Sequence, residues 1–338
     1  MMRAIELRNT VIGFDGKDIL PPLSASSERA EITTLLGCNG IGKSTLLKTI
    51  AALHSPISGS LVVDGRDIFS MTRRDITATI SYVSTEPVKA SNMRVSDLIA
   101  FGRYSHTNWI GRLLESDRRV IAESADKVGL SALLNRFVDE ISDGERQRAM
   151  IARALAQDTP LMVMDEPTAF LDTRNSSEIL NLMVSLARNE EKGLLMSTHD
   201  IQSAINYSDK IWLMTEGGIK EGGTEDMVAD GSIGEMFRGS SVTFCPVEGS
   251  FRPSARGRGK MRFYLQGEGV EAIWAGKAIK RAGGILCDKA GEDADFRLTA
   301  GSGRDGKCLF SLDDGSNIVT FSSIYQMSQY LRSGNIIC

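Results

Sequence analysis

Three short apolar runs stand out in the first two hundred residues: 32–36 (ITTLL), 161–164 (LMVM) and 193–196 (GLLM). Runs of this length without polar alternation are typical of parallel strands that are buried on both faces. Each run is followed by glycine-rich or polar sequence. Ligands bind at the carboxyl ends of the strands in an open parallel sheet. The pattern therefore predicts an α/β core with a candidate site where these strands end.

Helical periodicity follows in two places. One helix is predicted to begin near Lys43, directly after a glycine-rich turn. Another, within 141–157, begins after Ser142 and Gly144. Its apolar side is formed by Met150, Ile151, Ala154 and Leu155. Helix N-termini present N–H groups that can hold an anion, so the chain is predicted to have two such positions.

The pattern changes after residue 239. Residues 252–262 contain five basic residues with proline and glycine, and we interpret 240–262 as a basic, solvated linker. Contact with anionic lipid or with a partner is the alternative for this segment. The elements predicted beyond it are strands at 261–267, 284–289 and 295–301, helices at 269–283 and 323–334, and a hairpin at 307–322. Residues 263–338 are thus predicted to form a small α+β accessory domain, with a regulatory or dimer-stabilising role as the default.

Composition limits the function classes. A chain of 338 residues is about right for two domains. Its net charge of −4 argues against a nucleic-acid binder held by bulk charge. Charged residues interrupt the N-terminus, and no apolar run approaches the roughly 18–20 residues that span a bilayer, so we expect a cytoplasmic protein. Five cysteines without a C-x-x-C pair predict reduced, mostly buried thiols.

The first glycine-rich turn has a specific chemistry. Gly37, Gly42, Lys43 and Ser44 satisfy the pattern G-x-x-x-x-G-K-[ST] after a predicted strand. Glycines bring backbone N–H groups against phosphates, and the helix N-terminus adds its partial positive charge. Lys43 is expected to reach the β- and γ-phosphates, Ser44 to bind Mg²⁺, and Thr45 to lie near the α-phosphate. The turn therefore predicts a nucleoside triphosphate site.

Three further polar residues follow the other two apolar runs. Asp165 suits a Mg²⁺ contact through water, and Glu166 suits the role of general base toward the attacking water. His199 follows the third run and can donate a hydrogen bond to a γ-phosphate oxygen. Together these residues predict hydrolysis as well as binding of the nucleotide.

The order of four motifs makes the chain resemble the nucleotide-binding subunits of ATP-binding cassette (ABC) transporters over about residues 3–238. These motifs are the phosphate loop 37–45, ISDGERQ at 141–147, LMVMDEPTAFLD at 161–172 and STHD at 197–200. A Gly-Arg-aromatic run within 100–113 makes the importer subunits for iron–siderophore, haem or cobalamin complexes the most similar group. The resemblance implies a P-loop NTPase cassette in 1–239, with a mixed sheet core and a helical subdomain at about 88–158.

In that family two cassettes sandwich two ATP molecules, and each site joins the phosphate loop of one copy to the signature motif of the other. The resemblance therefore implies that Ser142 and Gly144 contact the partner's ATP and that Asp172 lies at the subunit contact. Phe14 matches the aromatic residue that stacks on adenine, with plain core packing as its alternative. The nucleotide contacts it implies are Phe14, Gly37, Asn39, Gly40, Gly42, Lys43, Ser44, Thr45, Ser142, Gly144 and Asp172.

Two departures from the family pattern matter. The signature has Asp143 and Glu145, where the usual sequence is Leu-Ser-Gly-Gly-Gln, and we expect binding to survive because the serine and second glycine remain. The family's Mg²⁺-binding glutamine near residue 85 is replaced by Thr85 with Glu86 beside it. Either residue offers an oxygen ligand, and both stay open as metal ligands.

The sequence thus predicts the ATP-hydrolysing subunit of a bacterial importer, with ATP and Mg²⁺ as cofactors, peripheral on the cytoplasmic face of the inner membrane. Its expected partners are a second copy of itself, integral membrane permease subunits and, indirectly, a substrate-binding protein, but no nucleic acid. The rival hypothesis is a soluble ABC ATPase that acts in cofactor or protein assembly without a permease. A nucleotide sensor without turnover is a third, and the presence of Glu166 and His199 argues against it.

Overall fold

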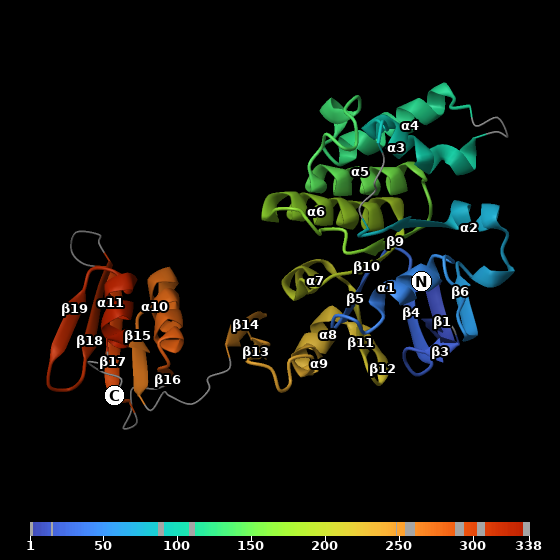
Figure 1. Cartoon of the computed structure of the whole chain (residues 1–338). Coiled ribbons are helices and arrows are strands. Elements are labelled where there is room, and N and C mark those ends of the chain that lie inside the picture. The colour runs from blue at the N-terminus through green and yellow to red at the C-terminus, as the bar shows by residue number, and fades with distance from the viewer. Residues whose placement is uncertain are drawn as a thin grey trace. The chain divides into compact units, whose positions relative to one another are not determined.

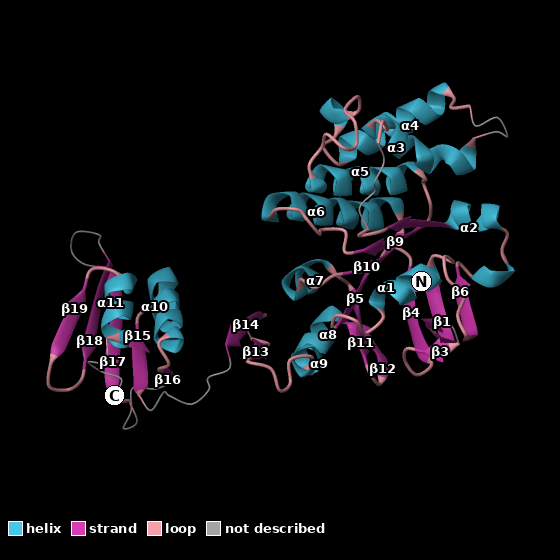
Figure 2. Ribbon diagram, viewed as in Figure 1, coloured by secondary structure: helices cyan, strands magenta, loops and turns pink. Residues whose placement is uncertain are grey.

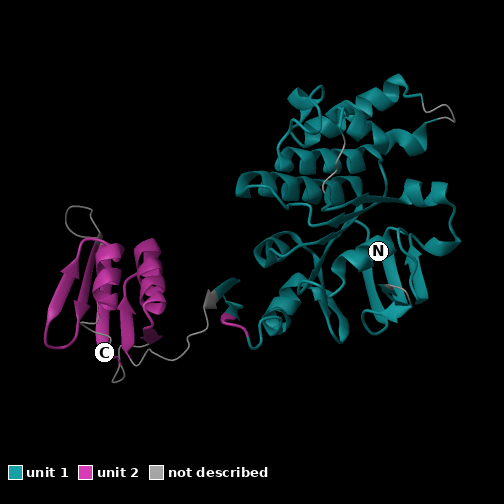
Figure 3. Cartoon of the chain, viewed as in Figure 1, with its two compact units in different colours: residues 1–239, 243–251 teal, residues 240–242, 252–338 magenta. Residues whose placement is uncertain are grey.

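The computed structural model describes residues 3–14, 16–86, 91–107, 112–247, 249–253, 261–287, 294–302 and 308–333, with only the backbone for Phe14, Arg252, Pro253, Ser302 and Cys308. The chain divides into two compact units, which Figure 3 distinguishes by colour. The first comprises Met1–Gly239 and Thr243–Phe251, and the second Ser240–Val242 and Arg252–Cys338. Each unit is described separately below.

A six-stranded sheet forms the centre of the first unit, in the order β12-β11-β5-β10-β9-β8. Its strands are β5 (Ile32–Gly37), β8 (Ile80–Val83), β9 (Leu161–Asp165), β10 (Gly193–Ser197), β11 (Lys210–Thr215) and β12 (Gly218–Gly223). All neighbours are parallel except β11 and β12. The three predicted apolar runs are β5, β9 and β10, and every residue of these strands is buried, which confirms the predicted α/β core.

A four-stranded antiparallel sheet, in the order β4-β1-β6-β7, packs against one face of the first sheet and shares a hydrophobic core with it (Figure 1). Its strands are β1 (Arg3–Val11), β4 (Leu23–Glu28), β6 (Ser58–Val63) and β7 (Arg66–Asp67), and β2 (Gly13–Phe14) pairs with β3 (Lys17–Asp18). The indole of Trp212 on β11 is fully buried and donates a hydrogen bond to the Ser26 carbonyl of β4 at 3.1 Å. Helix α1 (Lys43–Ile50) packs into the same core.

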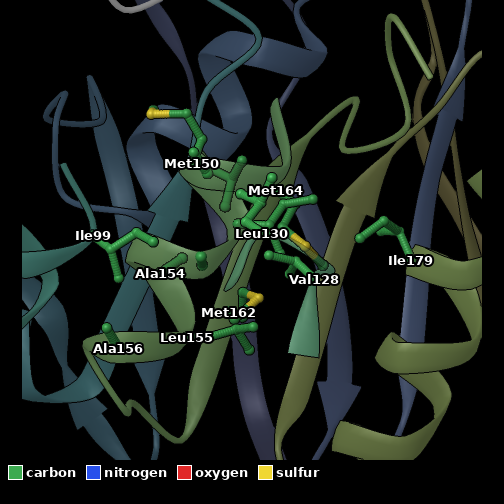
Figure 4. Packing of buried hydrophobic residues seen from close by; sticks show 14 of the residues in the cluster. Ile99, Val128, Leu130, Met150, Ala154, Leu155, Ala156, Met162, Met164 and Ile179 are labelled. Atoms are coloured by element: carbon green, nitrogen blue, oxygen red, sulfur yellow. The ribbon is translucent and has the colours of Figure 1, made fainter. Parts of the chain in front are cut away.

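A group of helices covers the other side of the six-stranded sheet. It comprises α3 (Val95–Ala100), η2 (Phe101–His106), α4 (Glu115–Lys127), η3 (Ser131–Leu133), α5 (Asp143–Ala156) and α6 (Thr173–Glu190). Figure 4 shows Met150, Ala154 and Leu155 of α5 packed with Met162 and Met164 of β9. The predicted apolar side of this helix is therefore confirmed, and it fixes α5 against the strand that carries Asp165.

The Gly-Arg-aromatic run has a packing explanation. A Cβ atom on Gly102 would lie 2.1 Å from the Arg153 carbonyl oxygen of α5, so only glycine fits there. The neighbouring Arg103 donates hydrogen bonds to Asp117 Oδ1 at 3.0 Å and to the Ala156 carbonyl at 2.9 Å. This buried ion pair joins η2 and α4 to the end of α5.

The remaining elements of the first unit are η1 (Ile68–Ser70), α2 (Arg73–Thr79), α7 (Ile201–Tyr207), α8 (Thr224–Ala229) and α9 (Ser232–Glu235). Strands β13 (Val242–Cys245) and β14 (Ser250–Pro253) lie mostly in the first unit. The β13–β14 hairpin falls within 240–262. Its Phe251 ring lies 4.7 Å from that of Phe237 and 5.2 Å from that of Phe244. Residues 242–247 and 249–253 are therefore folded, which the interpretation of 240–262 as a solvated linker did not anticipate, while 248 and 254–260 lie outside the described residues.

The second unit is a five-stranded sheet in the order β16-β15-β17-β18-β19, with two helices on one face (Figure 2). Its elements are β15 (Arg262–Gln266), α10 (Gly269–Arg281), β16 (Ile285–Cys287), β17 (Phe296–Ser302), β18 (Cys308–Asp313), β19 (Ile318–Phe321) and α11 (Ile324–Arg332). Each strand and helix predicted beyond residue 260 is present. The second unit therefore has the predicted α+β fold with its own core, centred on Phe263, Leu298 and Phe310.

No helix within the described ranges is both long and apolar enough to cross a membrane. Cys38 is exposed, and Cys245 and Cys287 are only half-buried, so the prediction of mostly buried thiols is wrong for these three.

Candidate active site

The glycine-rich loop connects β5 to α1, as its motif requires. Gly40 and Gly42 have φ angles of 79° and 107°, a left-handed backbone conformation that favours glycine. Gly42 is the N-cap of α1, and no side chain satisfies the N–H groups of its first turn. The predicted anion-binding N-terminus is therefore present.

Lys43 crosses the inside of this loop. Its Nζ donates hydrogen bonds to the Gly37 carbonyl at 2.7 Å and to the Cys38 carbonyl at 3.1 Å. Burial lowers the pKa of Lys43, and the nearby Glu166 and Asp165 carboxylates oppose this shift. The lysine is thus held at the mouth of the loop, close to the two acids that follow β9.

The other phosphate-loop residues are open to a ligand. Asn39, Gly40 and Ser44 are exposed, and Thr45 is half-buried on the first turn of α1. The Ser44 hydroxyl and the loop amides therefore lie on the surface beside Lys43, as the motif predicts.

Ser197 organises the two acids. The pairing of β9 with β10 places Asp165 opposite Ser197. The Ser197 hydroxyl donates to Asp165 Oδ1 at 2.6 Å and accepts a hydrogen bond from the Glu166 amide at 3.0 Å. Ser197 is fully buried, and the STHD motif at 197–200 did not by itself reveal its role. The matching positions of Asp165 and Ser197 at the ends of their apolar runs are the signal that could have revealed it.

Glu166 and His199 form a contact pair at the same sheet edge. The His199 Nε2 lies 2.6 Å from Glu166 Oε1. Glu166 has a φ of 48°, unusual for a residue other than glycine, and this turn directs its side chain away from the strand line. Both side chains remain partly exposed, so a water molecule can reach the carboxylate. This geometry suits a general base that a histidine orients.

The signature segment begins α5 with a tightly paired cap. Ser142 is the N-cap, and Glu145 Oε2 accepts hydrogen bonds from both its amide and its hydroxyl, each at 2.9 Å. These two hydrogen bonds lower the pKa of Glu145, and the bond from the Ser142 amide has the larger effect. Asp143 forms an ion pair with Arg146 at 2.5 Å. The two acids that depart from the family pattern are therefore both paired.

The signature helix is also tied to the segment after β9. The buried Gln147 side chain donates to the Pro167 carbonyl at 3.3 Å. A Cβ on Gly144 would lie 3.1 Å from the Phe170 carbonyl oxygen, closer than most side chains tolerate. The signature helix and the Glu166–Asp172 segment are therefore packed together and hydrogen-bonded as one local body.

Two pockets border this body. An open pocket of about 540 Å³ is lined by Ser142, Asp143, Gly144, Glu145, Arg148, Phe170, Leu171, Asp172 and Asn175. A smaller one of about 150 Å³ is lined by Thr85, Glu86, Asp143, Arg146, Gln147, Met150 and Phe170. The structure thus gathers the three predicted cross-subunit residues, Ser142, Gly144 and Asp172, at one pocket that includes no phosphate-loop residue.

The two candidates for the missing glutamine follow β8. Glu86 is 75% exposed and accepts a hydrogen bond from Lys48 Nζ of α1 at 2.8 Å. This bond lowers the pKa of the Glu86 carboxyl. Thr85 is half-buried beside it. The side chain of Phe14, the predicted adenine contact, lies outside the described residues.

A phosphate loop between strand and helix, with a paired aspartate, glutamate and histidine at the ends of adjacent parallel strands, defines a P-loop ATPase. Comparison with known proteins then identifies the family. The family model for "ABC transporter" matches residues 20–169.

Relatives extend the match beyond that model. An uncharacterized ABC transporter ATP-binding protein of Methanocaldococcus jannaschii is 35% identical over 73% of this chain and 86% of its own. The iron(3+)-hydroxamate import ATP-binding protein FhuC of Bacillus subtilis is 33% identical over 70% of this chain and 88% of its own length. A candidate metal-chelate type ABC transporter, solved in an inward-facing conformation, matches this chain with a TM-score of 0.62 and 25% identity. The match covers 74% of this chain and 95% of the solved chain. The chain belongs to the ATP-binding proteins of ABC transporters, and it is an ATPase.

Replacing Ser197 with alanine tests the hydroxyl that joins the two acids. Ser197→Ala leaves Asp165 Oδ1 and the Glu166 amide without this partner, which costs about 1–3 kcal/mol of unfolding free energy. Because the acids lose their alignment, we expect ATP hydrolysis to fall about tenfold and the Mg²⁺ requirement to rise. The measurement is a steady-state ATPase assay across Mg²⁺ concentrations.

Ser208→Ala is the matched control, because it removes another buried hydroxyl that bonds to Thr34 in the same sheet core. It should destabilise the protein comparably and leave hydrolysis unchanged. Equal activity in Ser197→Ala and Ser208→Ala would contradict the assigned role of Ser197.

Proposed function

We propose that this chain is the ATP-hydrolysing subunit of an importer for a metal chelate of the iron–siderophore, haem or cobalamin class. The observation that carries the proposal is its similarity to an iron(3+)-hydroxamate import subunit over most of that protein's length. The likeness to a candidate metal-chelate transporter supports the same class. The geometry of the site supplies the chemistry that such a subunit needs.

In this proposal the phosphate loop binds the triphosphate and Lys43 exchanges its carbonyl partners for phosphate oxygens. Charge-assisted contacts of this kind are stronger than neutral hydrogen bonds. Glu166 takes a proton from the attacking water, while His199 holds the carboxylate in position and can turn to a γ-phosphate oxygen. Hydrolysis thus relies on positioning and charge, with a single proton acceptor.

The donor set fits Mg²⁺ that arrives with ATP. Mg²⁺ prefers oxygen ligands and usually combines one or two protein groups with phosphates and water. Among the described residues no group of three or more His, Cys, Asp or Glu could hold a metal ion alone, whereas Ser44 and Asp165 offer one hydroxyl and one carboxylate. Bound there, Mg²⁺ would screen the charge of the phosphates.

We propose Thr85 or Glu86 as a further oxygen ligand in place of the usual glutamine. Glu86 has more reach and charge, but it must release Lys48 to turn toward a metal. Thr85 needs no such exchange and has the shorter reach. Both border the pocket beside the signature helix, so either choice links the nucleotide site to that surface.

We further propose that two copies form composite ATP sites. Ser142, Gly144 and Asp172 share one pocket and are separate from the chain's own phosphate loop, so they suit a nucleotide held by another copy. Arg146 forms an ion pair with Asp143, and Ser142 donates a hydrogen bond to the Glu145 carboxylate. These contacts reduce the repulsion that the two acids would exert on a γ-phosphate. ATP would favour the closed dimer and hydrolysis would release it.

Glu166→Gln tests the base and the dimer together. The amide can hold water but cannot accept its proton, so ATP hydrolysis should fall roughly 10²–10⁴-fold while ATP still binds. The variant should then accumulate as an ATP-dependent dimer, measured by size-exclusion chromatography with light scattering.

Adding Ser142→Arg to Glu166→Gln is the control for the composite site. The larger cation blocks the signature pocket, so the double variant should bind ATP as a monomer. A dimer that persists in the double variant, or normal turnover by Glu166→Gln, would contradict the assignment.

In the proposed transporter the chain lies on the cytoplasmic face of the cell membrane, bound to permease subunits that receive their cargo from a substrate-binding protein. The alternative is an ABC ATPase that acts in cofactor or protein assembly without a permease. Purification of the tagged chain from detergent-solubilised membranes of its own host separates the two. We expect a polytopic membrane protein in stable ratio to the chain, and loss of metal-chelate uptake in a Glu166→Gln strain.

Lys43→Ala serves as a second inactive allele, because it disables the nucleotide site by a different change. Recovery of the chain with only water-soluble partners, together with normal chelate uptake in both strains, would favour the assembly alternative.

A further inference from the structure

Helix α10 of the second unit presents apolar side chains on two opposite sides. Ala272, Ala275 and Ile279 are buried against the sheet. On the outer side Val270, Ile273 and Trp274 have exposed fractions of 64%, 59% and 54%. Their i, i+3, i+4 spacing places them on one face. Single exposed apolar residues are common, but three adjacent ones that include a tryptophan form a patch.

Cations continue the same face toward the end of α10. Lys277, Lys280 and Arg281 are exposed, and the Lys277 Nζ lies 4.4 Å from the centre of the Trp274 ring. Favourable interaction with the helix dipole accounts for Lys280 and Arg281 in the last turn. It does not account for the exposed tryptophan and isoleucine beside them.

Helix α11 lies beside α10 and adds exposed aromatic and basic side chains to the unit. It contacts α10 on the same face of the sheet (Figure 2) and exposes Tyr325 at 67%, together with Arg332. Within α10 and α11 the sequence has one acidic residue, Glu271, against four basic ones. We call the exposed face of α10 the outer layer: Val270, Ile273, Trp274, Lys277, Lys280 and Arg281.

Charge is divided unevenly between the two parts of the chain. Residues 252–338 contain 13 Lys and Arg against 9 Asp and Glu, a net charge of +4. Residues 1–251 contain 26 against 34, a net charge of −8. The basic run 252–262 directly precedes β15. The positive charge of this part comes from the basic run, because residues 263–338 contain 8 Lys and Arg against 9 Asp and Glu, a net charge of −1.

We propose that the outer layer binds the surface of an anionic membrane. Tryptophan, isoleucine and valine insert at the boundary between headgroups and acyl chains, and lysine and arginine contact lipid phosphates. A second copy fits less well, because a two-fold contact between two outer layers would bring their cations together. The proposal goes beyond the proposed transport function and does not depend on it.

Vesicle flotation with the full-length chain tests this proposal. The protein should float with phosphatidylcholine vesicles that contain phosphatidylglycerol, not with phosphatidylcholine alone, and salt should weaken binding because it screens exposed charges. Lys280→Glu with Arg281→Glu should lower the partition coefficient by at least about tenfold. Ile273→Ser with Trp274→Ser should lower it by a similar factor.

Ile318→Ser is the matched control, since Ile318 is 67% exposed on β19 and lies outside the outer layer. It should bind vesicles as the unchanged protein does. ATP hydrolysis should be unchanged in all these variants, which separates this test from that of the catalytic site.

Tryptophan fluorescence supplies a second readout. The chain has three tryptophans, and Trp212 is fully buried. Anionic vesicles should shift the emission to shorter wavelength, and Trp274→Phe should abolish the shift. Equal binding to neutral vesicles would overturn the proposal, and so would unchanged vesicle binding by the double variants. A change that appears only in the mass of the protein in solution would favour a contact between two copies and would also overturn it.

Discussion

The parallel pairing of β9 with β10 is the constraint on which the site depends. Because Asp165 lies opposite Ser197, one buried hydroxyl binds the carboxylate of Asp165 and the backbone amide of Glu166. A slip by one residue would turn these side chains to the other face of the sheet. The two faces of these strands pack into two different cores, so packing on both faces holds the register, and the register holds the two acids in place.

The same packing carries the constraint to the signature helix. The apolar side of α5 lies on β9, and Gln147 reaches the backbone just beyond Glu166. A movement of α5 would therefore act on the segment that holds Glu166. This gives a physical route by which contacts at the signature pocket, or at Thr85 and Glu86, can affect the catalytic edge, through packing and hydrogen bonds that are continuous in one unit.

Much of the fold could be predicted from the sequence, because it rests on local patterns. The apolar runs 32–36, 161–164 and 193–196 give the strands, and the phosphate-loop motif gives the turn before α1. No single local pattern gives the role of Ser197, since that role comes from the pairing of strands far apart in the chain, and only a comparison of the two run ends points to it. The contact between Glu86 and Lys48 and the packing of Phe251 against Phe237 and Phe244 could not be predicted for the same reason, because both join parts of the chain that are apart in the sequence.

The central claim is that the loop between β5 and α1 is the ATP site, and equilibrium titration with a fluorescent ATP analogue tests it most directly. Lys43→Ala removes the buried ammonium from the loop, whereas Lys48→Ala removes a lysine from the following turn of α1. A charged hydrogen bond contributes about 1.5–3 kcal/mol, so Lys43→Ala should weaken binding by at least roughly tenfold. Lys48→Ala should bind within about twofold of the unchanged protein. Unaltered affinity in Lys43→Ala would contradict the assignment of the site.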